Sequence, residues 1–179
     1  MFMKSKMKLR EWAKTQRISE KTNEKNATIL KKIKEINVFS SAKNVMLFYP
    51  LKYEVDLIGL LELSKHYSFP CIENNEIIPY LNNGDFIVGQ FNIKEPVKLK
   101  KQPIEDIDLV IVPALCVDKN GNRVGYGKGY YDRFIKKLDR NRTKIMVAIL
   151  DKFLVEDIEV NEFDEKIDFI VTEKRVIQI

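Results

Sequence analysis

The sequence predicts an α/β domain whose largely parallel central sheet is flanked by helices. Apolar strand-like runs alternate with helical patterns, residues 109–112 are apolar throughout, and a glycine-rich loop at 121–129 precedes another helical pattern. Parallel strands covered on both faces read as continuous apolar runs. Because alternating strands and helices favour a sheet of this kind, we expect residues 1–179 to form a single α/β domain.

The first half of the chain is expected to hold three helices and four strands. Helical spacing of apolar residues predicts helices at 5–17, 20–36 and 55–66, the last closed by His66. Ile29, Ile33 and Ile36 form one stripe of the second helix. Short runs bounded by Pro and Asn predict strands at 45–49, 68–72, 77–81 and 86–88.

The second half continues the alternation. Strands are expected at 109–112, 144–149 and 169–171, and a helix at 130–138 with Phe134, Ile135 and Leu138 on one side. In open α/β sheets, ligands bind beyond the carboxyl ends of the strands. The segments 49–54, 113–130 and 150–164 all follow predicted strands, so we expect them to meet at one site.

Composition places the chain among ordinary cytoplasmic domains. Its residues are 45% hydrophobic, which is enough for a sizeable core. No apolar stretch is long enough to cross a bilayer, and no apolar h-region follows the first lysines. The two cysteines, Cys71 and Cys116, are too few for a disulfide framework and are expected to be buried and reduced.

Positive charge is concentrated at the N-terminus. Residues 1–34 hold eleven Lys or Arg and three Glu, whereas the whole chain carries a net charge of +5. A helical arm with a solvated basic face is one interpretation, and contact with a polyanion is another. Lys6 and Arg10 are four residues apart, so on a helix they share a face and can grip one phosphate group. Nucleic acid is the weaker alternative, because no aromatic platform or helix-turn-helix pattern accompanies the charge.

Residues 121–133 are the most informative stretch. Gly125, Gly127 and Gly129 alternate with other residues around Lys128, and the predicted helix follows. Glycines let a backbone turn through positive φ and approach a ligand closely. The spacing matches neither a Walker A loop nor a Rossmann fingerprint. A plain turn is the alternative, but a turn has no need of the charges on Lys128, Arg123, Asp132 and Arg133.

These residues carry a family resemblance. Val112 to Leu115, Asp118, Gly121, Arg123 and the run Gly125 to Arg133 resemble the signature of the 5-formyltetrahydrofolate cyclo-ligase family. The likeness extends over nearly all of the chain and includes Lys6, Arg10, Glu54, the Glu95–Pro96 pair and Asp164. It implies a fold similar to ribose-5-phosphate isomerase and the CoA transferases. It also implies a C–N bond-forming ligase that uses ATP and Mg²⁺ to convert 5-formyltetrahydrofolate into 5,10-methenyltetrahydrofolate.

The resemblance assigns roles to individual residues. Catalysis is expected from Lys128 and Tyr130, and Mg²⁺ binding from Asp132 and Asp164. ATP-binding residues are expected to be Lys6, Arg10, Arg123, Gly125, Gly127, Lys128, Gly129, Tyr130 and Tyr131. Folate-binding residues are expected to be Tyr49, Glu54, Tyr126, Lys128 and Tyr130.

Local chemistry alone leaves some of these roles open. Tyr130 is equally suited to core packing, and Glu54, Asp132 and Asp164 are also suited to helix starts or turns. One departure from the family pattern is Phe163, which stands where His or Asn usually precedes the aspartate. We expect ATP and 5-formyltetrahydrofolate as ligands, no membrane or nucleic-acid partner, and a monomer. An RNA-binding or regulatory protein on the same scaffold, or a related enzyme with another substrate, is the alternative.

Overall fold

The protein is built around a seven-stranded sheet whose five central strands are parallel. The computed structural model describes residues 5–20, 22–61 and 64–179. The strand order is β12-β11-β9-β6-β1-β2-β3. Strands β11, β9, β6, β1 and β2 run parallel, and β12 and β3 pair antiparallel at the two edges. This confirms the predicted α/β class and its largely parallel sheet.

The main-sheet strands are short. They are β1 (Asn44–Met46), β2 (His66–Glu73), β3 (Glu76–Leu81), β6 (Leu109–Ile111), β9 (Lys144–Ala148), β11 (Phe169–Val171) and β12 (Val176–Gln178). A second sheet has the order β10-β7-β8, and β4 and β5 form a separate hairpin. Their strands are β4 (Phe86–Val88), β5 (Lys94–Pro96), β7 (Cys116–Asp118), β8 (Arg123–Val124) and β10 (Leu154–Val155).

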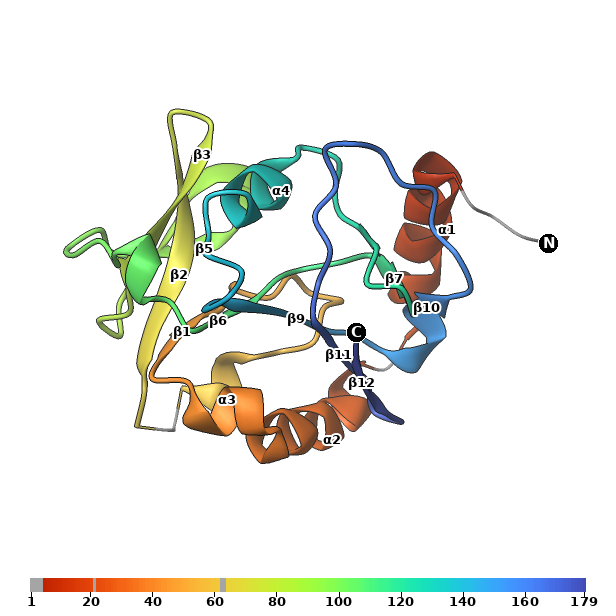
Figure 1. Cartoon of the computed structure of the whole chain (residues 1–179), viewed down its shortest axis with the longest axis horizontal. Helices are drawn as coiled ribbons and strands as arrows, with labels where there is room; N and C mark the ends of the chain where they lie inside the picture. The colour runs from red at the N-terminus through yellow and green to blue at the C-terminus, as the bar shows by residue number, and fades with distance from the viewer. Residues whose placement is uncertain (1–4, 21, 62–63) are drawn as a thin grey trace.

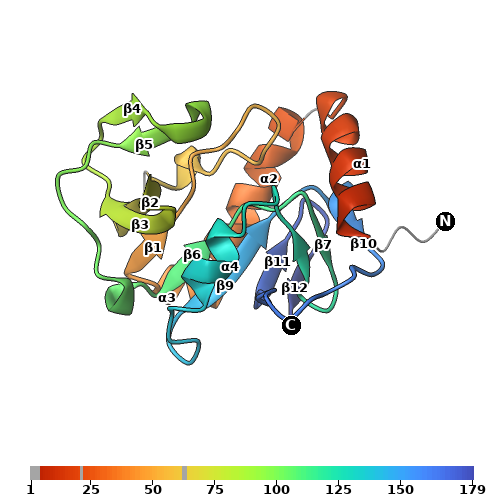
Figure 2. The same cartoon turned by 90° about the horizontal axis from the view of Figure 1, so that it is seen from above.

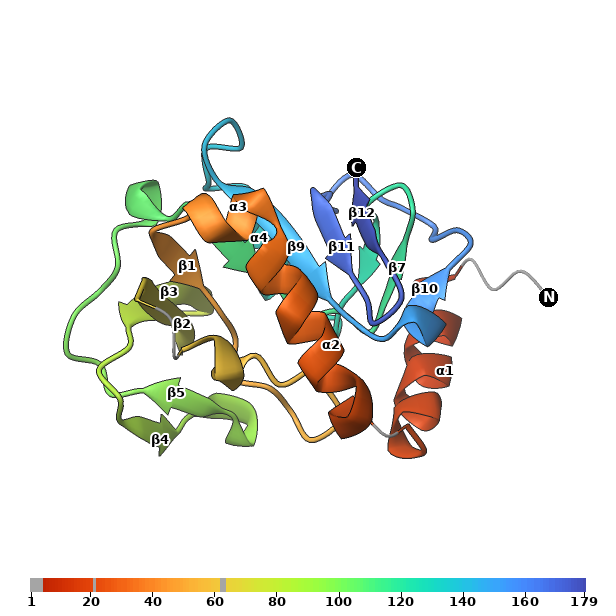
Figure 3. The same ribbon diagram turned by 90° about the horizontal axis from the view of Figure 1, so that it is seen from below.

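Helices cover both sides of the main sheet. Helices α2 (Thr22–Glu35) and α3 (Asn37–Ser41) lie along one face, as Figure 3 shows. The short helix α4 (Tyr130–Ile135) lies on the opposite side (Figure 1). Helix α1 (Lys6–Ile18) packs against β7 and β8, so the expected N-terminal arm is part of the body of the protein. Figure 2 shows α1 at one end of the molecule and the β4–β5 hairpin at the other.

The apolar pattern of the sequence explains the core. All residues of β6 and β11 are buried, as expected for strands covered on both faces. In α2, the stripe residues Ile29 and Ile33 are completely buried and Ile36 packs against the same cluster. Cys71 and Cys116 are buried and free, as predicted. Among the described residues, no helix is long and apolar enough to cross a membrane.

The prediction of a helix at 55–66 was wrong. A single 3₁₀ turn at Ile58–Leu60 replaces it, and His66 begins strand β2 instead of closing a helix. Asp56 explains the early turn: its side chain accepts the Ile58 N–H, and its backbone N–H and C=O both bond to the Asn26 side chain. These contacts fix a turn and dock it on α2 before a helix is established. Residues 62–63 of the predicted helix lie outside the described residues.

Two other helices differ in length from the prediction. The helix predicted at 20–36 is α2, which ends at Glu35; Ile36 has extended backbone angles, and the short helix α3, which was not predicted, follows it. Helix α4 ends at Ile135, three residues earlier than predicted, and continues as turns to Leu138. Because α4 has only six residues, the anion-binding role expected of its N-terminus passes to the loop that precedes it.

Candidate active site

A pocket of about 670 Å³ brings the three predicted segments together. Its walls include residues 49–54, the glycine loop and the turn at 161–164, and also residues of β2, β3 and the β4–β5 hairpin. Every residue to which the sequence assigned a role lines this pocket. They are Lys6, Arg10, Tyr49, Glu54, Arg123, Gly125, Tyr126, Gly127, Lys128, Gly129, Tyr130, Tyr131, Asp132 and Asp164.

The glycine loop runs from β8 to α4 across one wall. Gly127 and Gly129 have positive φ values of 98° and 68°, as the glycine pattern predicted, whereas Gly125 does not. Arg10 of α1 donates from Nε to the Gly125 carbonyl at 2.9 Å. A Cβ on Gly127 would lie 3.4 Å from Arg10 Cζ, so the bare backbone lets helix and loop meet closely. The loop is therefore clamped to α1 beside the pocket.

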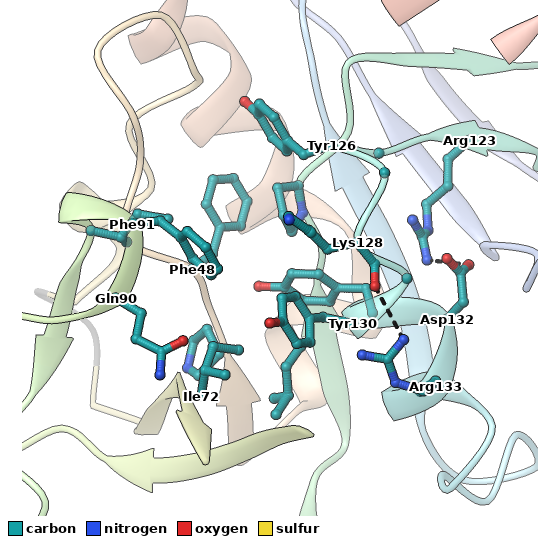
Figure 4. Close-up of a pocket in the computed structure, with 18 of the residues that line it drawn as sticks. Phe48, Ile72, Gln90, Phe91, Arg123, Tyr126, Lys128, Tyr130, Asp132 and Arg133 are labelled. Atoms are coloured by element: carbon teal, nitrogen blue, oxygen red, sulfur yellow. Dashed lines mark hydrogen bonds and ion pairs between the residues drawn. The ribbon is translucent and has the colours of Figure 1, made fainter. Parts of the chain in front are cut away.

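Lys128 projects from this loop into the pocket (Figure 4). Its backbone carbonyl accepts a bond of 3.1 Å from Arg133, which braces the loop against α4. Its ammonium group has no hydrogen-bond or ion-pair partner within the described part of the chain. A mobile cation in a cavity is suited to neutralise an anionic ligand, because its charge is not already engaged.

Glu54 lines the same pocket and is 8% exposed. One carboxylate oxygen accepts the Leu51 N–H at 2.8 Å, and the other accepts the Tyr126 hydroxyl at 2.6 Å. Burial, and then the negative charge of Glu54, raise the pKa of Tyr126, so this phenol stays protonated and donates. Glu54 is not the helix-start residue that local chemistry allowed, because the described residues between it and β2 form loop and the single 3₁₀ turn at Ile58–Leu60.

Arg17 is a member of this cluster that the sequence reasoning missed. Its guanidinium is buried, with Nη1 3.9 Å from Glu54 Oε1 and Nη2 2.5 Å from the Ala114 carbonyl. It also lies 5.0 Å from the centre of the Phe153 ring. The available signal was its place on α1, because Leu9, Ala13 and Arg17 follow at four-residue spacing and all three are buried. An arginine on an apolar stripe indicates a buried charge that requires a partner.

Asp132 and Asp164 approach the pocket from α4 and from the 161–164 turn. Asp132 Oδ1 pairs with Arg123 Nη2 at 2.6 Å, and Asp164 pairs with Lys6. Arg123 is buried; burial lowers its pKa, and the charge of Asp132 opposes that effect. Asp132 is thus more than a helix-start charge, because it anchors a buried cation (Figure 4).

The donor set at these aspartates fits Mg²⁺ in one respect. Mg²⁺ is usually held by one or two carboxylates, with substrate phosphates and water completing the octahedron. Two carboxylates beside a cationic loop match that arrangement. Within the described ranges, no group of three or more Asp, Glu, His or Cys residues forms a complete protein-only metal site. Both carboxylates are engaged by cations, so a metal would share them with Arg123 and Lys6.

Aromatic rings form the remaining wall. Phe91, at the tip of the β4–β5 hairpin, faces Tyr130 with ring centres 6.2 Å apart and planes inclined by 49°. Phe91 is 58% exposed and has φ of +58°, an uncommon angle for a non-glycine residue. The hairpin holds it there, and Figure 4 shows Phe91 and Phe48 on the wall opposite Arg123 and Asp132. Phe91 was not predicted, because β5, which completes its hairpin, has the sequence Lys-Glu-Pro and shows no apolar pattern.

The pocket as a whole is cationic at one side and aromatic at the other. Seven Lys or Arg residues line it against four Asp or Glu residues. Such a lining suits a ligand pair with several phosphate charges and a flat ring system. The arrangement can hold a phosphoryl donor on the glycine loop and a heterocycle between the aromatic walls.

Comparisons with known proteins agree with this chemistry. The model of the 5-formyltetrahydrofolate cyclo-ligase family matches residues 3–173. The 5-formyltetrahydrofolate cyclo-ligase of Mycoplasma genitalium is 31% identical over 136 residues, with 72% of each chain covered. That of Mycolicibacterium smegmatis is 28% identical over 150 residues, covering 76% of this chain and 77% of the relative.

A solved structure resembles the whole fold. The 5,10-methenyltetrahydrofolate synthetase of Aquifex aeolicus superimposes with a TM-score of 0.86 and is 31% identical. The superposition covers 97% of this chain and 92% of that one.

Proposed function

The chain belongs to the 5-formyltetrahydrofolate cyclo-ligase family and converts 5-formyltetrahydrofolate into 5,10-methenyltetrahydrofolate with ATP, and we propose that the 670 Å³ pocket is its active site. The observation that carries the proposal is the separation of charge within one cavity. The unengaged Lys128 and the clamped glycine loop form one part, and the buried Glu54 carboxylate forms the other.

The reaction requires that a poor leaving group be activated. The formyl oxygen attacks the γ-phosphorus of ATP, the bond to ADP breaks, and a phosphorylated imine forms at N5. N10 then attacks the former formyl carbon, the carbon–oxygen bond breaks, phosphate leaves and N10 loses its proton. The protein must align the formyl oxygen with the phosphoryl group, neutralise charge and exclude water.

Glu54 and the aromatic wall hold the folate. A buried carboxylate accepts two N–H bonds from an aminopyrimidine edge, and Tyr126, Leu51 and Arg17 keep this one fixed. Phe91, Tyr49 and Tyr130 supply flat apolar surface for the pterin ring. Tyr130 therefore combines packing against the core with a place in the pocket, where its hydroxyl orients the substrate.

The glycine loop and α1 hold the triphosphate. The backbone N–H groups of residues 125–131 are donors for phosphate oxygens, and Lys128 neutralises the phosphoryl group during transfer. Lys6 and Arg10 add charge from α1, and Arg123 adds charge from beneath the loop. Arg10 already bonds to the Gly125 carbonyl, so it ties the loop and the nucleotide to the same helix.

Mg²⁺ completes the proposed site. Asp132 and Asp164 would hold it, and the ion would supply positive charge between the phosphates. Arg123 and Lys6, which pair with these carboxylates, would add positive charge beside the phosphate oxygens. We also propose that the chain is one domain, which its continuous core supports. We further propose that it works in the cytoplasm as a monomer. Size-exclusion chromatography with light scattering tests the oligomeric state.

Two matched variants test the proposal by the substrate that each affects. Glu54→Gln presents a donor where the pterin requires an acceptor, so it should raise the folate KM about 10-fold or more with little change for ATP. Arg10→Ala should raise the ATP KM and leave the folate KM near its parent value. Initial rates are followed by the near-ultraviolet absorbance of the methenyl product. An equal effect of either variant on both substrates would contradict the assignment.

A further inference from the structure

Helix α1 runs along the pocket and contacts it near both of the helix's ends. Arg17, near its C-terminus, approaches Glu54, and Lys6, at its N-terminus, pairs with Asp164. Arg17 follows Lys6 by eleven positions, which is roughly 16 Å along a helix. Arg10 lies between them and reaches the glycine loop. The pocket therefore has a Glu54 end and an Asp164 end, with the glycine loop between.

This order fixes the direction of the nucleotide, given the proposed function. The formyl oxygen must meet the γ-phosphate, so the γ-phosphate points toward the folate at the Glu54 end. The α-phosphate and the nucleoside must then extend the other way. Lys6 and the turn 161–164 are the elements on that side.

The side chain of Phe163 lies at that end of the pocket and is not part of the core. Phe163 lines the pocket and is 65% exposed, although large apolar side chains are usually buried. Its backbone N–H bonds to Asn161 Oδ1 at 2.9 Å, and the Asn161 N–H bonds to Asp164 Oδ2 at 2.7 Å. The Lys136 ammonium of α4 lies 5.3 Å from the centre of its ring. The turn and the lysine thus hold the ring at the pocket edge.

We propose that Phe163, with Lys136 beside it, is the platform on which the adenine base of ATP stacks. Every nucleobase has a π-face, and stacking on an exposed aromatic ring tightens binding without hydrogen-bond readout. Lys136 lies where its charge is also available to the adjacent phosphates. The folate rings do not require Phe163, because Phe91, Tyr49 and Tyr130 form the aromatic wall that the proposed function assigns to the pterin.

The test separates the base from the phosphates. Binding of ADP and of pyrophosphate is measured by calorimetry for the parent, Phe163→Ala and Phe163→Trp. Phe163→Ala should weaken ADP binding about 10-fold and leave pyrophosphate binding unchanged, whereas Phe163→Trp should bind ADP as the parent does. Phe91→Ala is the matched control, an exposed aromatic on the wall assigned to the pterin, and it should weaken folate binding only. Because Phe163 is exposed, its loss should leave the melting temperature unchanged.

Three results would be decisive against the platform. ADP affinity that is unchanged in Phe163→Ala, or an equal loss for ADP and pyrophosphate, would overturn it. A loss of folate affinity in place of ADP affinity would assign Phe163 to the folate instead. The premise is tested separately by Arg10→Ala, because equal pyrophosphate binding by that variant and the parent would contradict the phosphate assignment itself.

Discussion

At the scale of single residues, the charged groups of the pocket differ in how firmly they are held. Glu54 is buried and fixed by Leu51, Tyr126 and Arg17, so its carboxylate is held in one orientation before any ligand arrives. Lys128 is exposed on a glycine loop, and its ammonium is unengaged in the described part of the chain. The first arrangement suits recognition of a rigid ring, and the second suits a charge that moves with a phosphoryl group.

Lys128→Ala should therefore lower kcat about 100-fold while the protein stays folded. Removal of a charge-stabilising group costs this much in comparable sites, and an exposed loop lysine contributes little to stability. The rate of methenyl formation and the melting temperature are measured together. Lys119→Ala, an exposed lysine in the β7–β8 turn, is the matched control and should behave as the parent does. Parent-like turnover in Lys128→Ala would remove this lysine from the active site.

Asp132→Asn and Asp164→Asn test the metal assignment. Each should raise the Mg²⁺ concentration needed for half-maximal rate, and the double variant should be less than additive because both residues serve one ion. The Asp164 effect should be the smaller, since neighbouring Phe163 gives no polar support. Asp132→Asn also leaves the buried Arg123 without its partner, so its stability must be measured alongside. Mg²⁺ titrations that overlay the parent curve would show that neither carboxylate binds the ion.

At the scale of elements, most wholly apolar runs were predictable, and very short strands with polar residues were not. The patterns for α1, β3, β4, β6 and β11 lie within a few residues of the observed bounds. Strands β4, β6 and β11 have only three residues, but all of these are apolar. Strands β5, β7, β8 and β12 include polar or charged residues, and β10 has only two residues, so none of these shows a strand pattern in the sequence. The apolar residues of segment 55–66 have helical spacing. A turn forms there instead, because Asp56 bonds to Asn26, which lies 30 residues earlier in the sequence.

The same distinction holds within the site. The glycine loop and its charges are local in sequence, so they were recognisable. The partnership of Arg17 with Glu54 joins positions 37 residues apart and depends on how α1 packs on β7 and β8. Phe91 likewise owes its place to a hairpin of which only β4 was predicted, because β5 (Lys94–Pro96) carries no apolar pattern.

One element contact has a pH-dependent contribution to stability. Asp151, after β9, accepts bonds from Thr172 at 3.1 Å and from Arg175 at 2.8 Å, which ties that turn to the β11–β12 turn. Burial alone would raise the pKa of Asp151, but these bonds and the charges of Arg175 and Lys174 lower it overall. The stabilisation is therefore present above the unfolded-state value of about 4 and is lost as pH falls through the folded-state value.

Asp151→Asn should lower the melting temperature at pH 7 by about 2–8 °C. This corresponds to about 1–2 kcal/mol for hydrogen bonds to a charged group in a chain of this size. Its difference from the parent should shrink below about pH 4, where the parent carboxylate also becomes protonated. Glu156→Gln, at an exposed position, is the matched control and should not change the profile. A difference that persists undiminished at pH 2–3 would mean that charge is not its cause.

At the scale of the whole molecule, the parallel sheet explains why the site forms. Segments that follow β1, β6 and β9 meet at one end of the sheet, and α1 runs along the pocket that they line. The β4–β5 hairpin forms the wall opposite Arg123 and Asp132, where Phe91 lies (Figure 4). The proposed ligand positions follow this order of elements: folate at Glu54, phosphates on the glycine loop, and the nucleoside toward Asp164.

The most direct measurement is a crystal structure of the protein with Mg²⁺, a non-hydrolysable ATP analogue and 5-formyltetrahydrofolate. We expect the pterin on Glu54, the γ-phosphate beside Lys128 and the formyl oxygen, and the β- and α-phosphates leading past Arg10 toward Lys6. Electron density for the nucleotide outside this pocket, or with its γ-phosphate directed away from the folate, would contradict the account.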